Sequence, residues 1–203
     1  MSLTDLFISP AGAGDESGSS VANALPAISG GDWSTDIEAL DRAGKRFVWL
    51  TGTYNCTTQL TFSGSAPTVD TPNFWVGADA SGNVLRPKFD ETDLRLDTTD
   101  YPKIIISTNN SIVNIEEHSS YSCLSFENTH ASYNKGSIVD ATAGDTDIQH
   151  WFGCSFKAAP ANNNAEVMLG SNASFHTCTF EATTKQFARV LDLRSFGVAV
   201  NCR

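Results

Sequence analysis

The amino-acid sequence predicts an all-β solenoid, a fold in which short strands stack in successive coils, on the evidence of a repeat and a strand-like periodicity. Cys154, Cys178 and Cys202 follow one another at intervals of 24 residues. Phe156 and Phe180 each lie two residues beyond their cysteine. Repeats of roughly 20–50 residues that lack a helical pattern are typical of solenoids.

An earlier copy of the repeat precedes these three. It reads SSYSCLSF, contains Cys123 and ends at Phe126, and its cysteine lies 31 residues before Cys154. Leu169 and Leu193 each lie nine residues before the next cysteine, so the last two copies also align outside the cysteine. We therefore expect the coil after Cys123 to carry about seven extra residues.

Residues 1–45 are expected to form an N-terminal cap segment with a short helix. Residues 11–20 are small and polar, which predicts a loop. Ser34 or Thr35 is a suitable helix N-cap, and Gly44 is a suitable end. Acidic side chains early in this helix favour the positive end of its dipole.

Residues 46–203 are expected to form the coils. The segment RFVWLTGTYNC, which begins at Arg46, predicts a buried strand, a turn at Gly52 and a second strand. KIIIST and SIVNIEE are rich in β-branched residues and predict two more strands. Residues 90–102 are charged and predict an exposed loop or edge segment. No linker-like stretch divides the chain, which indicates a single domain.

Alternation along each strand assigns side chains to the inside or the outside of the coils. One face carries the recurring cysteines and phenylalanines, and we place this structural ladder on the inside. Its members are Cys123, Phe126, Cys154, Phe156, Cys178, Phe180 and Cys202. By the same alternation, the inside is also expected to hold His150, Phe152, Ser174 and His176.

Two sets of side chains are expected on the outside. Glu127, Lys157 and Glu181 each follow a ladder phenylalanine, so they should stack as acid, base and acid. Trp151 and Phe175 alternate out of phase with the ladder and are expected to be exposed. Exposed aromatics on neighbouring coils are candidates for binding a carbohydrate or a partner protein. The alternative is that a loop or a neighbouring strand covers them.

The composition excludes several classes of partner. The chain has 23 Asp and Glu against 13 Lys and Arg, a net charge of −10, which argues against nucleic acid and anionic membranes. No apolar run approaches the roughly 18 residues of a membrane span. The first residues, MSLTDLFISP, lack the basic and apolar regions of a signal peptide. Five cysteines in a chain of 203 residues indicate buried thiols rather than a disulfide framework.

No sequence pattern indicates catalysis, a cofactor or a metal. The four histidines lack the spacing of a helical metal site, and the cysteines occur singly. No G-x-S-x-G sequence marks a nucleophilic serine. Two acidic clusters could supply the paired carboxylates of a glycosidase, but both have the character of solvated loop charges. These clusters are Asp90, Glu91, Asp93, Asp97 and Asp100, and Asp140, Asp145 and Asp147.

Two long segments and the repeat itself match a known pattern. LFISPAGAGDESGSSVANALPAI, a helix and FVWLTGTY occur in that order, FWVGADASGNVLRP follows, and the cysteine-to-phenylalanine steps come last. This order resembles the cap, first coil and rungs of pectin-lyase-like right-handed parallel β-helix proteins. That family includes polysaccharide lyases and hydrolases, bacterial surface proteins, phage tailspikes and other virion proteins. The R-x-P-x-x-R and W-x-D-H motifs of its pectate lyases are absent here.

Our leading hypothesis is a non-enzymatic virion protein of a phage, either capsid-decorating or tail-associated. Assembly in the host cytoplasm needs no export signal and suits unpaired thiols. The expected partners are further copies of the chain, with a homotrimer favoured, and other virion proteins. The alternative is a tailspike-type module that binds or degrades a polysaccharide near Trp151. A third hypothesis, a bacterial surface adhesin, would need an export route.

The last copy of the repeat is incomplete. The sequence stops at Cys202 and Arg203, one residue before the next expected aromatic. A solenoid that ended there would leave its last coil uncovered. We therefore expect a longer polypeptide or a partner subunit to cover it.

Overall fold

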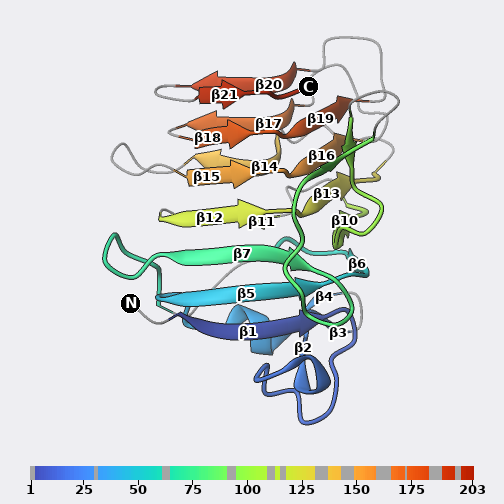
Figure 1. Ribbon diagram of the computed structural model, residues 1–203, viewed down its shortest axis with the longest axis vertical. Helices are drawn as coiled ribbons and strands as arrows, with labels where there is room; N and C mark the ends of the chain where they lie inside the picture. Colours follow the sequence, from blue (N-terminus) through green and yellow to red (C-terminus); the bar gives the residue numbers. More distant parts are fainter. Residues whose placement is uncertain are drawn as a thin grey trace.

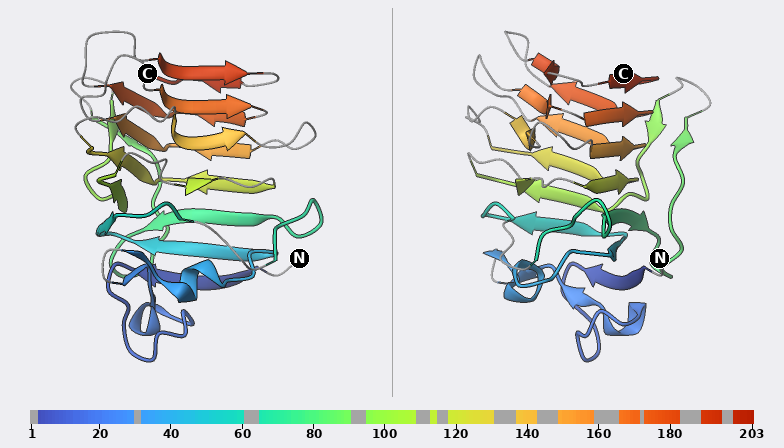
Figure 2. Two further views of the ribbon diagram at one scale, coloured as in Figure 1. Left: turned by 180° about the vertical axis from the view of Figure 1, so that it is seen from behind. Right: turned by 90° about the vertical axis from the view of Figure 1, so that its left-hand side faces the viewer.

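The computed structural model shows an all-β protein built mainly from parallel sheets (Figure 1). It describes residues 3–29, 32–60, 65–90, 95–108, 113–114, 118–130, 137–142, 149–158, 166–171, 173–182, 189–194 and 198–203. The strands of three sheets lie in layers, one above another, from the N-terminal to the C-terminal part of the molecule (Figure 2).

The largest sheet has eight strands in the order β2-β1-β5-β7-β12-β15-β18-β21. All of its neighbouring strands pair in parallel. The strands are β1 (Thr4–Ser9), β2 (Leu25–Pro26), β5 (Lys45–Leu50), β7 (Asn73–Ala78), β12 (Ser119–Ser122), β15 (Gln149–Phe152), β18 (Ala173–His176) and β21 (Val198–Val200).

Two smaller parallel sheets accompany the eight-stranded sheet. From β12 to β21 the chain visits the eight-, five- and four-stranded sheets in turn, and we call each such circuit a pass. The five-stranded sheet consists of β6 (Thr53–Cys56), β10 (Lys103–Ile106), β13 (Ser125–Asn128), β16 (Ser155–Ala158) and β19 (Thr179–Ala182). The four-stranded sheet consists of β11 (Val113–Asn114), β14 (Ser137–Thr142), β17 (Glu166–Ser171) and β20 (Arg189–Arg194).

Strand pairing places the repeated phenylalanines in register. Phe126 pairs with Phe156, and Phe156 pairs with Phe180. The spacing in register is 30 residues from β13 to β16 and 24 residues from β16 to β19. The longer pass therefore carries six extra residues, one fewer than the cysteine spacing predicts. The difference arises because Leu124, and not Cys123, aligns with Cys154.

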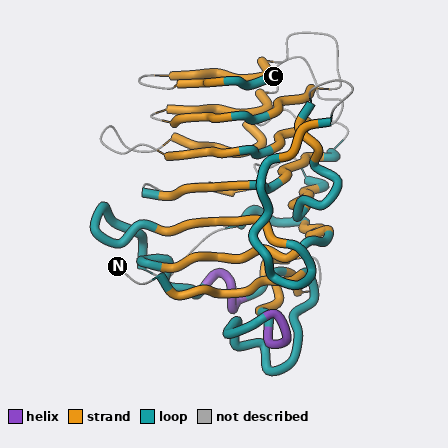
Figure 3. The backbone as a smooth tube through the Cα atoms, viewed as in Figure 1, coloured by secondary structure: helices purple, strands orange, loops and turns teal. Residues whose placement is uncertain are grey.

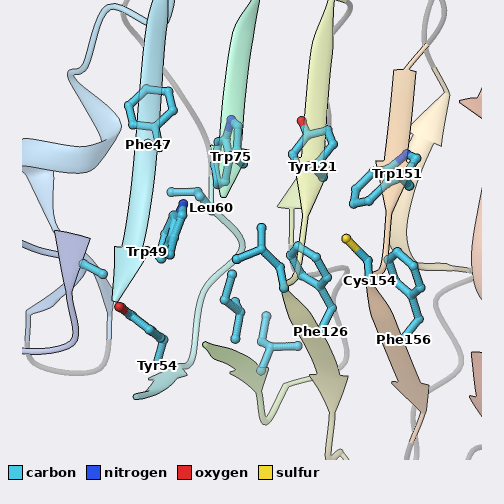
Figure 4. Close-up of a cluster of buried hydrophobic side chains, with 14 of the residues drawn as sticks. Phe47, Trp49, Tyr54, Leu60, Trp75, Tyr121, Phe126, Trp151, Cys154 and Phe156 are labelled. Atoms are coloured by element: carbon cyan, nitrogen blue, oxygen red, sulfur yellow. The ribbon is translucent and has the colours of Figure 1, made fainter. Parts of the chain in front are cut away.

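The interior is a continuous column of aromatic rings that crosses successive strands (Figure 4). Trp75, Tyr121, Trp151 and Phe175 occupy equivalent positions in the eight-stranded sheet. Tyr121 stacks on Trp151 with ring centroids 4.0 Å apart, and Trp151 stacks on Phe175 at 6.2 Å. The rings of the five-stranded sheet meet this column edge to face, as Phe156 does with Trp151 at 5.3 Å.

The ladder phenylalanines form the matching column on the facing sheet. Phe126, Phe156 and Phe180 stack in parallel, with centroids 5.6 and 5.1 Å apart, and all three are buried.

Phe180 to alanine is therefore expected to lower the free energy of unfolding by about 3 kcal/mol, as measured by urea titration. The neighbouring exposed change Glu181 to alanine should cost less than about 1 kcal/mol. A loss below about 1 kcal/mol for Phe180 would contradict its place in the core.

One backbone position at the corner between the eight- and five-stranded sheets is left-handed in four successive passes. Cys123, Gly153, Thr177 and Asn201 occupy it, with φ values of 52°, 59°, 58° and 52°. The N–H groups of the first three donate to a carbonyl of the next pass at 2.9–3.1 Å. This kink interrupts the alternation of inward and outward side chains. The alternation in the strand before the kink therefore cannot be continued into the strand after it.

Because of this kink, the histidines and Phe152 do not face the interior, where the sequence pattern places them. His150, Phe152 and His176 lie outside the sheet and are exposed, and Ser174 is partly exposed. Alternation counted backward from the buried Cys154 passes through the left-handed Gly153. It therefore assigns the side chains of the preceding strand to the wrong face. The expectation that these side chains face the interior is therefore wrong.

The first 45 residues contribute to the same sheet. β1 pairs with β5 over five residues, so part of the expected cap is a strand of the eight-stranded sheet. The 3₁₀ turn η1 (Val21–Asn23) and the helix α1 (Thr35–Glu38) both lie at the N-terminal end of the molecule (Figure 3). A short antiparallel pair, β3 (Ile28–Ser29) and β4 (Asp32–Trp33), precedes the helix.

The helix is shorter than the sequence predicts. Ser34 caps it, as expected, because its side chain accepts a hydrogen bond from the N–H of Asp36 at 3.2 Å. The helix ends at Glu38 instead of continuing toward Gly44. The N–H of Arg42 donates to the carbonyl of Ser65 at 2.9 Å, and that of Gly44 to Thr71 at 3.1 Å. These tertiary bonds replace the helical ones.

A long excursion between β7 and β10 packs back on the stack of strands. It contains the antiparallel hairpin β8 (Lys88–Phe89) and β9 (Leu96–Asp97), drawn in green in Figure 2. Leu85 and Leu96 pack in a cluster with Tyr101 and Cys123, at the corner described above. The charged segment is thus anchored by apolar residues rather than being wholly an exposed loop.

Candidate functional site: the outer face of the eight-stranded sheet

The outer face of the eight-stranded sheet carries no ionised side chain from β7 to β21. Pairing registers align its outward positions in two columns. None of these ten positions is an Asp, Glu, Lys or Arg, although the whole chain has a net charge of −10. The residues are Phe74, Val76, Ser120, Ser122, His150, Phe152, Ser174, His176, Val198 and Val200.

The apolar members of this outer face are exposed toward its C-terminal part. Phe152 and Val198 are each 50% exposed, and Val200 is 40% exposed. Phe152 pairs with His176, which in turn pairs with Val200, so these side chains form one continuous column. In this column an imidazole separates the two apolar side chains, and Val198 lies in the neighbouring column on the same strand as Val200. Exposed apolar side chains gathered on one face can mark an interaction surface.

Two imidazoles lie within the same face. His150 and His176 are exposed, on adjacent strands. The Nδ1 atom of His150 lies 2.7 Å from the hydroxyl oxygen of Ser174, at the paired position on the next strand. This contact orients the ring across the strands. Imidazole and hydroxyl groups give the face donors and acceptors for hydrogen bonds.

Charge on this sheet is confined to its N-terminal part. Arg46 binds the carboxylate of Asp5 with two hydrogen bonds, of 2.8 Å from Nε and 2.6 Å from Nη2. The hydrogen bond to Asp5 raises the pKa of Arg46, which keeps the guanidinium protonated. The pair neutralises itself, so it adds no net charge to the sheet.

The aromatic side chains expected to be exposed, Trp151 and Phe175, are completely buried. They occupy the interior column, because the left-handed residues at the corner shift the phase of β15 and β18. Their assignment as exposed binding residues is therefore wrong. The exposed aromatic of β15 is its neighbour, Phe152. Alternation within β15 alone places Trp151 with Gln149 and Phe152 with His150, but it does not indicate which of the two faces is buried.

The charge column expected from the sequence lies on the outside of the five-stranded sheet. Glu127 pairs with Lys157, and Lys157 pairs with Glu181. The Nζ atom of Lys157 lies 3.9 Å from a carboxylate oxygen of Glu181. Both side chains are substantially exposed, so solvent screening leaves this contact a small contribution to stability.

A groove separates the β8–β9 hairpin from the five-stranded sheet. Its volume is about 460 Å³, and it combines hydroxyl, guanidinium and carboxylate groups with two apolar side chains. The sequence did not indicate this groove, because it forms only when the excursion folds back on the strands. Its lining residues are Arg95, Leu96, Thr98, Ser155, Thr179, Phe180, Glu181 and Arg203.

The acidic clusters supply little to this groove. Asp97 is fully exposed, and hydrogen bonds from Thr99 lower the pKa of its carboxyl group. Glu91, Asp93, Asp145 and Asp147 lie outside the described residues. Among the residues that the structure describes, no three His, Cys, Asp or Glu side chains form a group that could hold a metal ion. In the same part of the chain, no helix is long and apolar enough to cross a membrane.

Comparison with known proteins identifies no relative. No family model matches the chain, and neither a curated protein nor a solved structure matches it.

Proposed function

We propose that this protein is a right-handed parallel β-helix that serves as a non-enzymatic structural component of a phage virion, decorating the capsid or belonging to the tail. The three parallel sheets, visited in turn and paired in register, support this fold. The resemblance of the N-terminal segments to pectin-lyase-like proteins supports the class. In this proposal the chain is made in the host cytoplasm and assembles through the outer face of its eight-stranded sheet.

The uncharged outer face is the observation that carries the proposal. Copies of a chain with a net charge of −10 repel one another wherever their acidic surfaces meet. The outer face from β7 to β21 is a surface on which two copies can approach without burying an ionised group. Protein interfaces are depleted of charge at their centres and enriched in aromatic residues. Phe152, half-exposed within this face, fits such a centre.

Further copies of this chain and other virion proteins are the proposed partners. We favour a homotrimer, in line with the resemblance to tailspikes. The acidic composition supports neither nucleic acid nor an anionic membrane as a partner.

Introducing a charge at Phe152 is expected to break the assembly. Wild type should give the mass of an oligomer in mass photometry, and Phe152 to glutamate should give a monomer, since a buried carboxylate without a partner is costly. Asn55 to glutamate is the matched control, because Asn55 is exposed on the five-stranded sheet. The control should keep the wild-type mass.

Two results would contradict this proposal at different levels. A wild-type monomer at every concentration would exclude self-assembly through any face. An oligomer that survives the change at Phe152 would exclude the outer face as its contact. The virion assignment is tested separately, by mass spectrometry of purified phage particles for peptides of this chain.

A polysaccharide-binding or polysaccharide-degrading module is the second candidate, and the groove beside the hairpin favours it. The side chains of Arg95, Thr98 and Glu181 offer the donors and acceptors that sugar hydroxyls require, and Leu96 offers an apolar surface. Titration with polygalacturonate and alginate, followed by absorbance of unsaturated products, would test it. Binding that disappears in Glu181 to glutamine would move this candidate ahead of the structural role.

A further inference from the structure

Three cysteines occupy the same position in three successive passes. Cys154, Cys178 and Cys202 each follow the left-handed residue at the corner between the eight- and five-stranded sheets. Pairing of Ser155 with Thr179 and of His176 with Val200 sets the register on either side of them. Cys154 therefore lies beside Cys178, and Cys178 lies beside Cys202. All three are free thiols.

The spacing of these passes suits a disulfide. Paired strands lie about 4.8 Å apart, within the range of about 4.4–6.8 Å between the Cα atoms of bonded cysteines. The N–H of Arg203 donates to the carbonyl of Cys178 at 3.0 Å, which holds the last two passes together at this point. The Sγ atom of Cys202 lies 3.5 Å from the carbonyl oxygens of both Phe175 and Val200. Cys178 makes the equivalent contacts one pass earlier, so the two thiols point in the same direction from neighbouring passes.

A cavity gives access to two of the three thiols. It has a volume of about 410 Å³ and lies between the β8–β9 hairpin and the corner, where Cys178 and Cys202 both line it. Cys202 is partly exposed, whereas Cys178 is buried. Cys154 is buried and does not line the cavity. A small molecule that enters the cavity can therefore contact Cys178 and Cys202 but not Cys154.

We propose that Cys178 and Cys202 are a redox-active thiol pair that a small disulfide of the glutathione class converts to an intramolecular disulfide. The thiolate of Cys202 attacks one sulfur of the small disulfide, forms a mixed disulfide and releases one thiolate. The thiolate of Cys178 then attacks the Cys202 sulfur and releases the second thiolate. The two protons lost by the cysteines end on the released thiols, so two thiols are oxidised as one disulfide is reduced.

The surroundings of the pair make this reaction slow at neutral pH. The hydrogen bond with Cys178 and partial burial raise the pKa of Cys202. The hydrogen bond with Cys154 and burial raise the pKa of Cys178, and together they outweigh the hydrogen bond with Cys202, which lowers it. Only the thiolate attacks a disulfide, so the rate should rise about tenfold for each pH unit while pH stays below these pKa values. The pair is thus a site that oxidises under sustained oxidising conditions and not one that turns over rapidly.

Incubation of the folded protein with glutathione disulfide tests the pair. Intact mass should fall by two hydrogen atoms, and a non-reducing peptide map should join the peptides of Cys178 and Cys202. Cys154 to serine should leave this cross-link in place, and Cys202 to serine should abolish it. Circular dichroism checks that each variant folds; if Cys202 to serine does not fold, the wild-type map alone decides.

Three outcomes would overturn the inference. They are an unchanged mass after prolonged incubation at alkaline pH, a glutathione adduct that persists on Cys202, and a cross-link that involves Cys154 in place of Cys202. They concern the corner between the eight- and five-stranded sheets, whereas the proposed assembly uses the outer face of the eight-stranded sheet, so this site and the proposed structural role are tested separately.

Discussion

Replacing Trp151 with alanine is expected to lower the free energy of unfolding by about 3–5 kcal/mol, the cost of removing a large aromatic from a packed core. Trp151 has no exposed surface, and its ring contacts the rings of Tyr121 and Phe175 in neighbouring strands. It also meets Phe126 and Phe156 edge to face across the interior. Loss of the ring would leave a cavity lined by four aromatics, since backbone pairing prevents the strands from collapsing into it. Urea titration monitored by far-ultraviolet circular dichroism measures the change.

Phe152 to alanine is the matched control for this experiment. It removes an aromatic ring from the next residue of the same strand, but Phe152 is half-exposed on the outer face. Its cost should be about 1 kcal/mol or less when the variant is studied at concentrations where both proteins are monomeric. A larger loss for Phe152 than for Trp151 would reverse the orientation of β15 and contradict the structure.

Replacing Gly77 with valine is expected to prevent folding or to cost several kcal/mol, because the side chain would enter space that backbone occupies. A Cβ atom at Gly77 would clash with the backbone carbonyl oxygen of Cys123. That oxygen belongs to the corner of the next pass, so relief of the clash would require β7 and β12 to separate. Overpacking that moves backbone is among the most destabilising single changes.

The yield of soluble protein and the urea midpoint test the change at Gly77. Val76 to alanine is the control, since Val76 lies next to Gly77 and is only partly buried, against a small cluster that includes Val48 and Ala78. The control should cost about 1 kcal/mol. A Gly77 variant that folds with the wild-type midpoint would show that β7 and the corner are farther apart than described.

Much of the core could be predicted from the sequence, because the same types of residue recur at the positions that stack. Phe156 and Phe180 recur with their cysteines, and stacked positions of a parallel sheet require similar side chains. The order of Glu127, Lys157 and Glu181 could be predicted for the same reason. Local chemistry limited the helix cap to Ser34 or Thr35, and the structure shows that it is Ser34.

The orientation of Trp151 and Phe175 could not be predicted by counting from the cysteines. Alternation counted from the cysteine crosses a left-handed residue, which reverses the assignment of faces. Glycine would signal such a residue, but only one of the four residues at that position is a glycine. Cysteine, threonine and asparagine there conceal the kink, because these residues rarely adopt a left-handed conformation. The N–H groups of Cys123 and Thr177 donate to a carbonyl of the next pass, and these bonds form only in the folded stack. The alternation within each strand remained valid on either side of the kink.

By itself, the sequence determined the all-β class, the 24-residue interval, the stacked phenylalanines and the stacking of Cys154, Cys178 and Cys202, since these follow from local patterns that repeat along the chain. The prediction that Cys123 stacks with them is wrong, because Leu124 aligns with Cys154. Only the tertiary structure decided which face of β15 and β18 is exposed, where the β8–β9 hairpin lies and which thiols share a cavity. Those features depend on contacts between residues far apart in the chain. The hydrogen bonds that bend the corner and the apolar anchors that hold the hairpin exist only after the strands have stacked.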